Sequence, residues 1–156
     1  MGREIERKFL VTSDGWRVLE HSADLIRQGY LSTGGGVTVR VRTVNDRIGL
    51  ITIKSGGAAI ERAEFEYEIP IADARELLVR CPGRLIEKRR HHLDLPNGEW
   101  VVDEFGGGHR GLVLLEVELP SAATPIELPD WVGAEVTGQA AYYNSALAAL
   151  PVGGEI

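Results

Sequence analysis

Short runs in which polar and apolar residues alternate, separated by glycine or proline, are the feature that most limits how this chain can fold. Successive side chains of a β-strand point to opposite faces, so such runs predict strands with one charged and one apolar face. The pattern predicts eight strands, over residues 3–11, 26–31, 37–44, 48–55, 63–69, 85–95, 99–105 and 112–119.

Turn-forming residues and two helical segments complete the predicted order of elements. Asn45-Asp46 and Pro96-Asn97-Gly98 favour tight hairpins between the strands that flank them. Helices are expected over 71–80, stopped by Cys81-Pro82-Gly83, and over 139–150. Strands and helices together predict an α+β fold with a sheet that can close on itself.

The composition fits one globular domain and argues against several classes of function. We expect a single domain over residues 1–150, with a frayed tail at 151–156. The single cysteine, Cys81, excludes an intramolecular disulfide and a cysteine-based zinc site. A net charge of −6 argues against broad nucleic-acid binding, which needs a basic surface. No apolar run approaches the roughly 20 residues of a membrane span. The first residues lack the apolar region of a secretory signal, so a cytoplasmic location is expected.

Charges of one sign recur two residues apart on the predicted strands. The simplest interpretation is that these faces point to solvent while the opposite faces form the core. Like charges so close together repel one another mildly, however, and a solvent face has no need of them. If the sheet closes, one polar face must point inward, and buried charges must be paired or bound to metal. The charged faces carry Glu4, Glu6 and Lys8; Arg40 and Arg42; Thr52 and Lys54; Glu64, Glu66 and Glu68; Lys88, Arg90 and His92; Asp103; and Glu116 and Glu118.

A closed sheet with these faces inside would enclose a lumen with an acidic side and a basic side. Carboxylate oxygens suit Mg²⁺ or Mn²⁺, hard cations that keep water ligands and bridge to phosphate oxygens. Arg and Lys suit the phosphates themselves, and Arg offers a planar bidentate fork. Such a lumen is suited to a metal-bound polyphosphate. It is unsuited to apolar ligands of the lipocalin type, which need an apolar interior.

The segment Glu4-Ile5-Glu6-Arg7-Lys8 resembles the ExExK signature that opens CYTH domains, or triphosphate tunnel metalloenzymes. The resemblance continues in order along residues 3–148. It is carried by Arg27-Gln28-Gly29-Tyr30-Leu31, Arg40-Val41-Arg42, Thr52-Ile53-Lys54, Arg62-Ala63-Glu64-Phe65-Glu66, Glu87-Lys88-Arg89-Arg90, Asp103 and Glu116-Val117-Glu118. The resemblance implies an eight-stranded antiparallel β-barrel with a hydrophilic tunnel and a few flanking helices. The short bacterial members that this chain resembles are mainly inorganic triphosphatases, which cleave tripolyphosphate to pyrophosphate and phosphate.

The resemblance also implies roles for the charged residues. The residues expected to bind metal are Glu4, Glu6, Glu116 and Glu118, with Glu64, Glu66 and Asp103 as ligands of a second ion or as groups that order the attacking water. The residues expected to bind phosphates are Lys8, Arg40, Arg42, Lys54, Lys88 and Arg90, with Arg62 at a strand edge. The expected catalytic residues are Lys8, Glu64, Glu66 and Asp103. The expected cofactor is Mg²⁺ or Mn²⁺, which would polarise phosphoryl oxygens and lower the pKa of a bound water.

The segment before the last predicted helix departs from the family. Many relatives carry Lys or Arg there, whereas residues 139–144 of this chain are Gln-Ala-Ala-Tyr-Tyr-Asn. A phosphate contact or tunnel plug from this segment is therefore not implied, although Tyr30 and Tyr142 could offer hydroxyl donors. His91 and His92 are interpreted as ordinary surface or lumen residues rather than metal ligands.

The leading functional hypothesis is a metal-dependent inorganic triphosphatase whose partner is a small polyphosphate. The alternatives are another triphosphate enzyme on the same scaffold, namely an ATP or thiamine triphosphate hydrolase or a class IV adenylyl cyclase, or a non-catalytic polyphosphate-binding module. The chain has only three Trp, four Tyr and three Phe, which favours an inorganic substrate over one with a base to stack. Neither nucleic acid nor a membrane is an expected partner. A homodimer is a further possible assembly, because many relatives are thought to dimerise.

Overall fold

The computed structural model describes residues 2–55 and 61–148, which contain strands, two α-helices and short 3₁₀-helices. The strands are β1 (Gly2–Val11), β2 (Glu20–Ser32), β3 (Val37–Val44), β4 (Ile48–Ser55), β5 (Glu61–Ile69), β6 (Ile86–Leu93), β7 (Glu99–Phe105), β8 (Val113–Glu118) and β9 (Val132–Glu135). The α-helices are α1 (Ile71–Val79) and α2 (Asn144–Ala148). The 3₁₀-helices are η1 (Gly15–Leu19), η2 (Gly107–His109) and η3 (Ala140–Tyr142).

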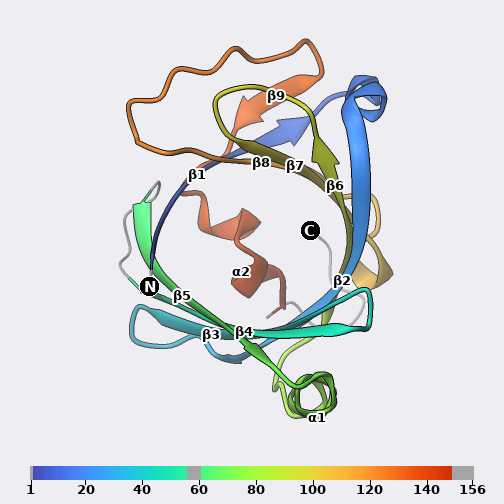
Figure 1. Ribbon diagram of the computed structural model, residues 1–156, viewed down its shortest axis with the longest axis vertical. Coiled ribbons are helices and arrows are strands. Elements are labelled where there is room, and N and C mark those ends of the chain that lie inside the picture. The colour runs from blue at the N-terminus through green and yellow to red at the C-terminus, as the bar shows by residue number, and fades with distance from the viewer. Residues whose placement is uncertain (1, 56–60, 149–156) are drawn as a thin grey trace.

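Eight of the strands close into an antiparallel barrel (Figure 1). The order around the ring is β5-β4-β3-β2-β6-β7-β8-β1, and β1 pairs with β5 to complete it. The first strand closes the ring, with Glu4 opposite Arg62 of β5 and Glu6 opposite Glu118 of β8. β9 pairs with the far end of β1, beyond the residues that pair with β5. The predicted α+β fold and eight-stranded barrel are confirmed.

Both predicted hairpin turns form, because their residues tolerate a left-handed backbone. Asn45 and Asp46 join β3 to β4 with φ angles of 53° and 54°, as the two central positions of a type I′ turn require. Asn97 has a φ of 72° in the turn between β6 and β7, and asparagine adopts this region at low cost. These turns set the register of the strands and hence which side chains face the interior.

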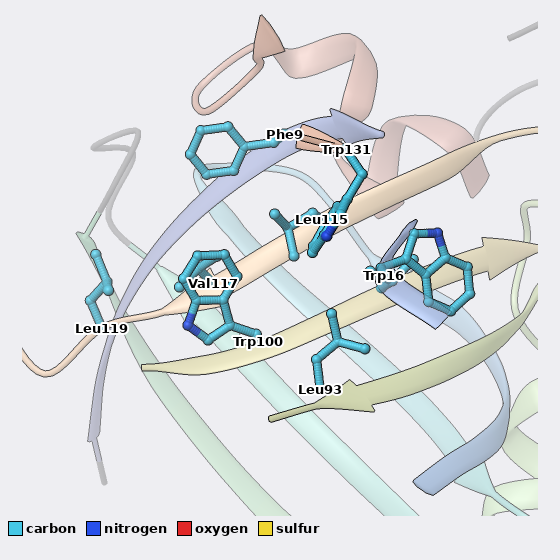
Figure 2. Close-up of a cluster of buried hydrophobic side chains, with 9 residues drawn as sticks. Phe9, Trp16, Leu93, Trp100, Leu115, Val117, Leu119 and Trp131 are labelled. Carbon is cyan, nitrogen blue, oxygen red and sulfur yellow. The ribbon is translucent and has the colours of Figure 1, made fainter. Parts of the chain in front are cut away.

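The largest apolar cluster lies outside the ring, on the outer faces of β1, β6, β7 and β8 (Figure 2). Trp100 and Val117 belong to these strands, and Trp16 of η1 and Trp131 before β9 pack against the same cluster. Because the interior is polar, the outer faces must supply the hydrophobic core. Their cover comes from η1 and the segment 120–131, neither of which is an α-helix. The alternation of polar and apolar residues within the strands could not predict which segments pack on these outer faces.

The helix predicted over 71–80 forms as α1 and flanks the barrel, where it lies over β3 and β4. Its Ala74 and Leu78 pack on Val41 of β3. The helix can approach closely because residue 49 of β4 is glycine, where a Cβ atom would lie 2.7 Å from the Cβ of Ala74. The helix ends at Val79, shortly before Pro82.

The last helix differs from the prediction, because it lies inside the ring of strands rather than against its outer surface (Figure 1). The helix expected over 139–150 divides into η3 and the five-residue α2, separated by Tyr143 in an extended conformation. Leu147 packs against the inward-facing Ile86 and Leu114 and thereby closes this end of the barrel. We call residues 140–148 the plug segment. Residues 149–156, which include the expected tail, lie outside the described residues.

Two further elements were not expected from the pattern. Strand β2 begins at Glu20 instead of residue 26, because its first half pairs with β6. Strand β9 has only four residues and follows a proline-containing loop, so its alternation is too short to recognise. Within the described part of the chain, no helix is both long and apolar enough to cross a membrane.

Candidate active site

A cavity of about 500 Å³ occupies the barrel. All the site residues predicted from the sequence line this cavity, with the exception of Asp103. The lining members are Glu4, Glu6, Lys8, Arg40, Arg42, Lys54, Arg62, Glu64, Glu66, Lys88, Arg90, Glu116 and Glu118. For the buried and half-buried members the simpler interpretation, in which the charged faces point to bulk solvent, is excluded, whereas Glu66 and Glu118 line the cavity but remain exposed.

Four cations from β3 and β6 form one group in the cavity: Arg40, Arg42, Lys88 and Arg90. We call them the basic group. Asp103 lies behind two of its members and is 0% exposed. Lys88 Nζ donates to Asp103 Oδ2 at 2.9 Å, and Arg90 donates from Nε and Nη2 to both carboxylate oxygens at 2.9 Å each. Asp103 therefore anchors two cations from the β7 wall.

The basic group holds more positive charge than Asp103 can offset. Burial, only partly opposed by Asp103, lowers the pKa of Lys88 to about 7. Burial, together with the charges of Arg40 and Arg90, lowers the pKa of Arg42 to about 9. Although burial opposes ionisation of Asp103, the charges of Arg90 and Lys88 lower the pKa of its carboxyl to about 2. An anionic ligand would relieve the repulsion among these cations.

Arg40 carries an unsatisfied donor. Its Nε is buried and has no hydrogen-bond partner among the described residues. Its Nη2 donates to Thr52 Oγ1 at 3.2 Å and lies 3.8 Å from Glu66 Oε1. Buried polar groups in native proteins are normally satisfied, and guanidinium groups bind phosphate oxygens well. The unpaired N–H of Arg40 therefore indicates a place for an anionic oxygen.

Carboxylates from β1 and β8 occupy another part of the wall, and two of them already have cation partners. Glu4 Oε2 lies 2.9 Å from Lys54 Nζ. Glu116 lies 3.5 Å from Lys8 Nζ and 3.1 Å from Arg90 Nη2. Despite burial, Lys54 lowers the pKa of Glu4, and Lys8 with Arg90 holds the pKa of Glu116 well below its usual range.

Three neighbouring carboxyls lack sufficient positive charge. Glu6 makes no hydrogen bond or ion pair with another described residue, and burial together with Glu116 and Glu4 raises its pKa to about 8. Burial and Glu4 also raise the pKa of Glu64 and of Glu118. An added cation near these groups would therefore be electrostatically favourable.

The donor set fits a hard divalent cation that arrives with its own water and substrate ligands. No three His, Cys, Asp or Glu side chains in the described ranges converge into a ready-made metal site. Mg²⁺ usually keeps several waters and is held by one or two carboxylates plus substrate phosphate oxygens. Glu6 and Glu118 are the candidates for such carboxylates, because neither has a cation partner in the described part of the chain.

The plug segment contributes two uncharged side chains to the cavity, which the pattern of charged residues in the sequence could not predict. Tyr143 and Asn144 line the cavity. Lys8 Nζ lies 5.9 Å from the centre of the Tyr143 ring and donates to the backbone oxygen of Tyr142 at 3.1 Å. Tyr30 lines the cavity as expected, but Tyr142 packs its side chain against the apolar cluster around Leu147.

His91 is a correction to the sequence interpretation. It is 4% exposed and lies neither on the surface nor in the lumen, since it packs beneath Trp16 on the outer side of β6. Its Nδ1 contacts the Glu20 carboxylate and its Nε2 lies 2.6 Å from Glu104 Oε1. His92 lines the cavity, which agrees with the interpretation of this residue as a surface or lumen residue.

Comparison with known proteins agrees with this geometry. The family model described as the CYTH domain matches residues 2–146. The chain belongs to the CYTH domain family. An inorganic triphosphatase of Acetivibrio thermocellus is 43% identical over 152 residues, which cover 97% of this chain and 96% of that protein. An inorganic triphosphatase of Nitrosomonas europaea is 39% identical over 151 residues, covering 93% of this chain and 96% of that protein.

Solved structures show the same fold in other CYTH-like proteins. The crystal structure of an inorganic triphosphatase matches this CYTH protein with a TM-score of 0.66 and 37% identity, covering 95% of each chain. A putative adenylyl cyclase from Hippeastrum, with a dominant triphosphatase activity, matches with a TM-score of 0.57 at 16% identity. That match covers 76% of this chain and 80% of the other, and it shows the fold alone.

Proposed function

We propose that this CYTH protein hydrolyses inorganic triphosphate to pyrophosphate and phosphate with the help of Mg²⁺ or Mn²⁺. The observation that carries the proposal is the sorting of charge inside a closed barrel. The basic group lies in the same cavity as Glu6 and Glu118, which have no cation of their own among the described residues. The names of the relatives from Acetivibrio thermocellus and Nitrosomonas europaea support the same reaction.

The charge balance of the cavity supports a cation that enters with the substrate. In the described ranges, seven Glu side chains and seven Lys or Arg side chains line the cavity, so their formal charges cancel. A triphosphate brings several negative charges, and the pairing of Glu4 and Glu116 already uses part of the positive charge. Divalent ions that bridge carboxylate and phosphate oxygens would restore the balance.

The chain's own residues would act mainly by positioning and by electrostatic stabilisation, which dominate phosphoryl transfer. The basic group would hold the phosphates, with the Nε of Arg40 donating to a phosphate oxygen. Lys8, fixed by Glu116 and the Tyr142 carbonyl, would offset charge on a transferring phosphoryl group. Glu64 and Glu66 are the candidates for ordering the attacking water. When bound, the divalent ion polarises phosphoryl oxygens and acidifies a bound water.

For Asp103 the contacts favour anchoring over metal binding. Both of its oxygens accept hydrogen bonds from Lys88 and Arg90, and it does not line the cavity. We infer that it orients two phosphate-binding cations. Asp103 was expected to be a ligand of a second metal ion. That expectation stays a prediction, and the contacts of Asp103 do not support it.

The decisive experiment measures product formation by the purified chain. Tripolyphosphate, ATP and thiamine triphosphate are each incubated with Mg²⁺, Mn²⁺ or EDTA, and phosphate, pyrophosphate and cyclic AMP are quantified. We expect the highest kcat/KM with tripolyphosphate, equal yields of phosphate and pyrophosphate, and no turnover in EDTA. Binding of tripolyphosphate without turnover under any condition would instead indicate a non-catalytic binding module, and cyclic AMP would indicate a cyclase.

A matched pair of variants tests the carboxylate assignment. Glu6→Gln removes the unpaired carboxylate and is expected to abolish most of the Mg²⁺-stimulated phosphate release. Glu68→Gln makes the same chemical change on β5, at an exposed residue that does not line the cavity, and should behave as wild type. Equal rates for Glu6→Gln and wild type would contradict the assignment of Glu6.

The homodimer and the cytoplasmic location remain predictions. The outer faces of β3, β4 and β5 place Val39, Ile53 and Phe65 in one row across the sheet, an apolar strip that supports the homodimer. Light scattering coupled to gel filtration would measure the mass of the particle. A monomer over the working concentration range would contradict the homodimer.

A further inference from the structure

The plug segment places one uncharged side chain among the cations of the cavity. Asn144 is 8% exposed, and its Oδ1 accepts a hydrogen bond from Lys88 Nζ at 2.9 Å and another from Gln28 Nε2 at 3.0 Å. Nothing in the established family membership assigns a role to either amide. Asn144 is therefore hydrogen-bonded to two strands of the barrel, to β2 through Gln28 and to β6 through Lys88.

Gln28 extends this contact to a second cation. It is 0% exposed, and its Oε1 accepts a hydrogen bond from Arg42 Nε at 2.8 Å. The direction of each bond follows from chemistry. Lys88 and Arg42 can only donate, so each must face an amide oxygen, and the NH₂ group of Gln28 is left to face Asn144. The hydrogen bonds are therefore donated in one direction, from Arg42 to Gln28 and from Gln28 to Asn144. We call this chain of hydrogen bonds the relay.

The relay leaves binding capacity on both cations. A lysine ammonium has three donors, and Lys88 uses one for Asp103 and one for Asn144. Arg42 uses Nε for Gln28, and its terminal nitrogens make no hydrogen bond to any residue that the structure describes. One amide of the plug segment thus fixes the orientation of two like charges while their remaining N–H groups stay available to a ligand.

The plug segment is small, so its position and that of the cations depend on each other. Its α2 has five described residues, which the barrel holds through apolar contacts of Leu147 and Ala148 and through the polar contacts of Asn144. Two hydrogen bonds hold its far end, from His109 Nε2 to the backbone oxygen of Leu147 at 2.8 Å and from the backbone N–H of Arg84 to the backbone oxygen of Ala148 at 2.7 Å. Lys8 adds a further contact by donating to the carbonyl of Tyr142 at 3.1 Å. If a seated plug segment favours anion binding, linkage requires an anion to favour the seated plug segment equally.

We propose that Asn144 is a positioning residue through which the plug segment orients Arg42 and Lys88, so that phosphate binding and seating of the plug segment stabilise each other. The proposal rests on the proposed function in taking a triphosphate as the ligand of the basic group. It goes further, because it makes an uncharged segment far along the chain part of the binding device.

The test uses the full chain and three variants. Asn144→Leu removes the acceptor while keeping a side chain of similar size, and Gln28→Leu breaks the same relay from the barrel wall. Gln139→Ala is the matched control just before the plug segment, since Gln139 is exposed and makes no side-chain capping bond. Kinetics are measured with tripolyphosphate and Mg²⁺. Amide hydrogen exchange over residues 140–148 is measured with and without tripolyphosphate in EDTA, and the folded fraction is measured by circular dichroism.

We expect tripolyphosphate to slow exchange in the plug segment of the wild type and of Gln139→Ala, but not in Asn144→Leu. A buried charged donor that loses its acceptor is costly, so kcat/KM per folded molecule should fall about tenfold or more in Asn144→Leu. Combining Asn144→Leu with Gln28→Leu should add little to either alone, because both break one relay. A merely structural role would lower the folded fraction but leave kcat/KM per folded molecule unchanged.

The outcomes separate this proposal from the proposed function. Wild type that cleaves tripolyphosphate, with an Asn144→Leu variant that keeps wild-type kcat/KM or wild-type protection of residues 140–148, would overturn this proposal alone. Wild type that fails to cleave tripolyphosphate would overturn the proposed function, while protection on binding would still support the coupling. Absence of both cleavage and protection in the wild type would overturn both.

Discussion

Replacing Asp103 by asparagine tests most directly how charge is held inside this barrel. The substitution keeps the size of the side chain and removes its charge, which leaves Lys88 without its buried counterion and Arg90 with Glu116 alone. We expect Asp103→Asn to fold less stably and to bind tripolyphosphate more weakly, because both cations lose the group that orients them.

The size of the stability loss follows from the pKa of Asp103. The ordinary value of 3.8 falls to about 2 in the folded protein, and each pKa unit corresponds to about 1.4 kcal/mol, so ionisation of Asp103 favours folding by about 2–3 kcal/mol. Breaking a buried ion pair by removing one partner typically costs about 3–5 kcal/mol. For a chain of this length about 1 kcal/mol shifts the melting temperature by roughly 2–4 °C. We therefore expect a decrease of roughly 5–20 °C at pH 7.

Thermal unfolding of wild type and Asp103→Asn in EDTA, followed by circular dichroism between pH 2 and pH 8, measures this loss. A carboxyl whose folded pKa is lowered contributes stability that is present above its unfolded pKa and is lost as the pH falls through the folded pKa. The gap between the two proteins should therefore be constant above pH 5 and shrink from pH 4 toward pH 2. Melting temperatures within 2 °C of each other at pH 7 would refute the reasoning, since metal is absent and only the ion pairs are tested.

Three other substitutions probe different parts of the molecule. Glu6→Gln in EDTA should leave the melting temperature nearly unchanged at pH 4, raise it at pH 6 and raise it further at pH 9, because a carboxyl whose folded pKa is raised to about 8 costs stability from its ordinary pKa of 4.5 upward; a gain that does not grow between pH 4 and pH 9 would contradict this. His91→Leu should cost about 1–3 kcal/mol in urea unfolding, because Glu20 loses its His91 partner and Glu104 keeps only Arg17; an unchanged denaturation midpoint would contradict this. Gly49→Val should cost about 1–3 kcal/mol through overlap with Ala74 while turnover per folded molecule stays the same, and an unchanged denaturation midpoint would count against the close packing of α1.

The barrel could be predicted from sequence because its main determinant is local. Period-two alternation is readable within each strand, and turns such as Asn45-Asp46 have their own chemistry. The strands with strong sorted charge, β1 and β5 among them, were found to within two residues. The same alternation predicted correctly that Glu6 and Lys88 share one enclosed space.

What could not be predicted depends on partners that are distant in the chain. Gln28 lies in the segment Arg27–Leu31 that resembles the family, but it is uncharged, and its contact with Arg42 follows only from register with the next strand. Asn144 belongs to a segment without charge, so sorted charge could not single it out. The anchoring contacts of Asp103 likewise follow only from its register opposite Arg90.

The multiple pairing of β1 has a consequence for how the protein comes to be folded. This strand is bonded to β5, β8 and β9, so the ring stays open until residues more than a hundred positions downstream are available. Joining such distant segments costs loop entropy, and chains dominated by distant contacts fold over milliseconds to seconds. The plug segment can enter only a ring that already exists. A chain still leaving the ribosome therefore has no enclosed place for phosphate until nearly all of its strands have emerged.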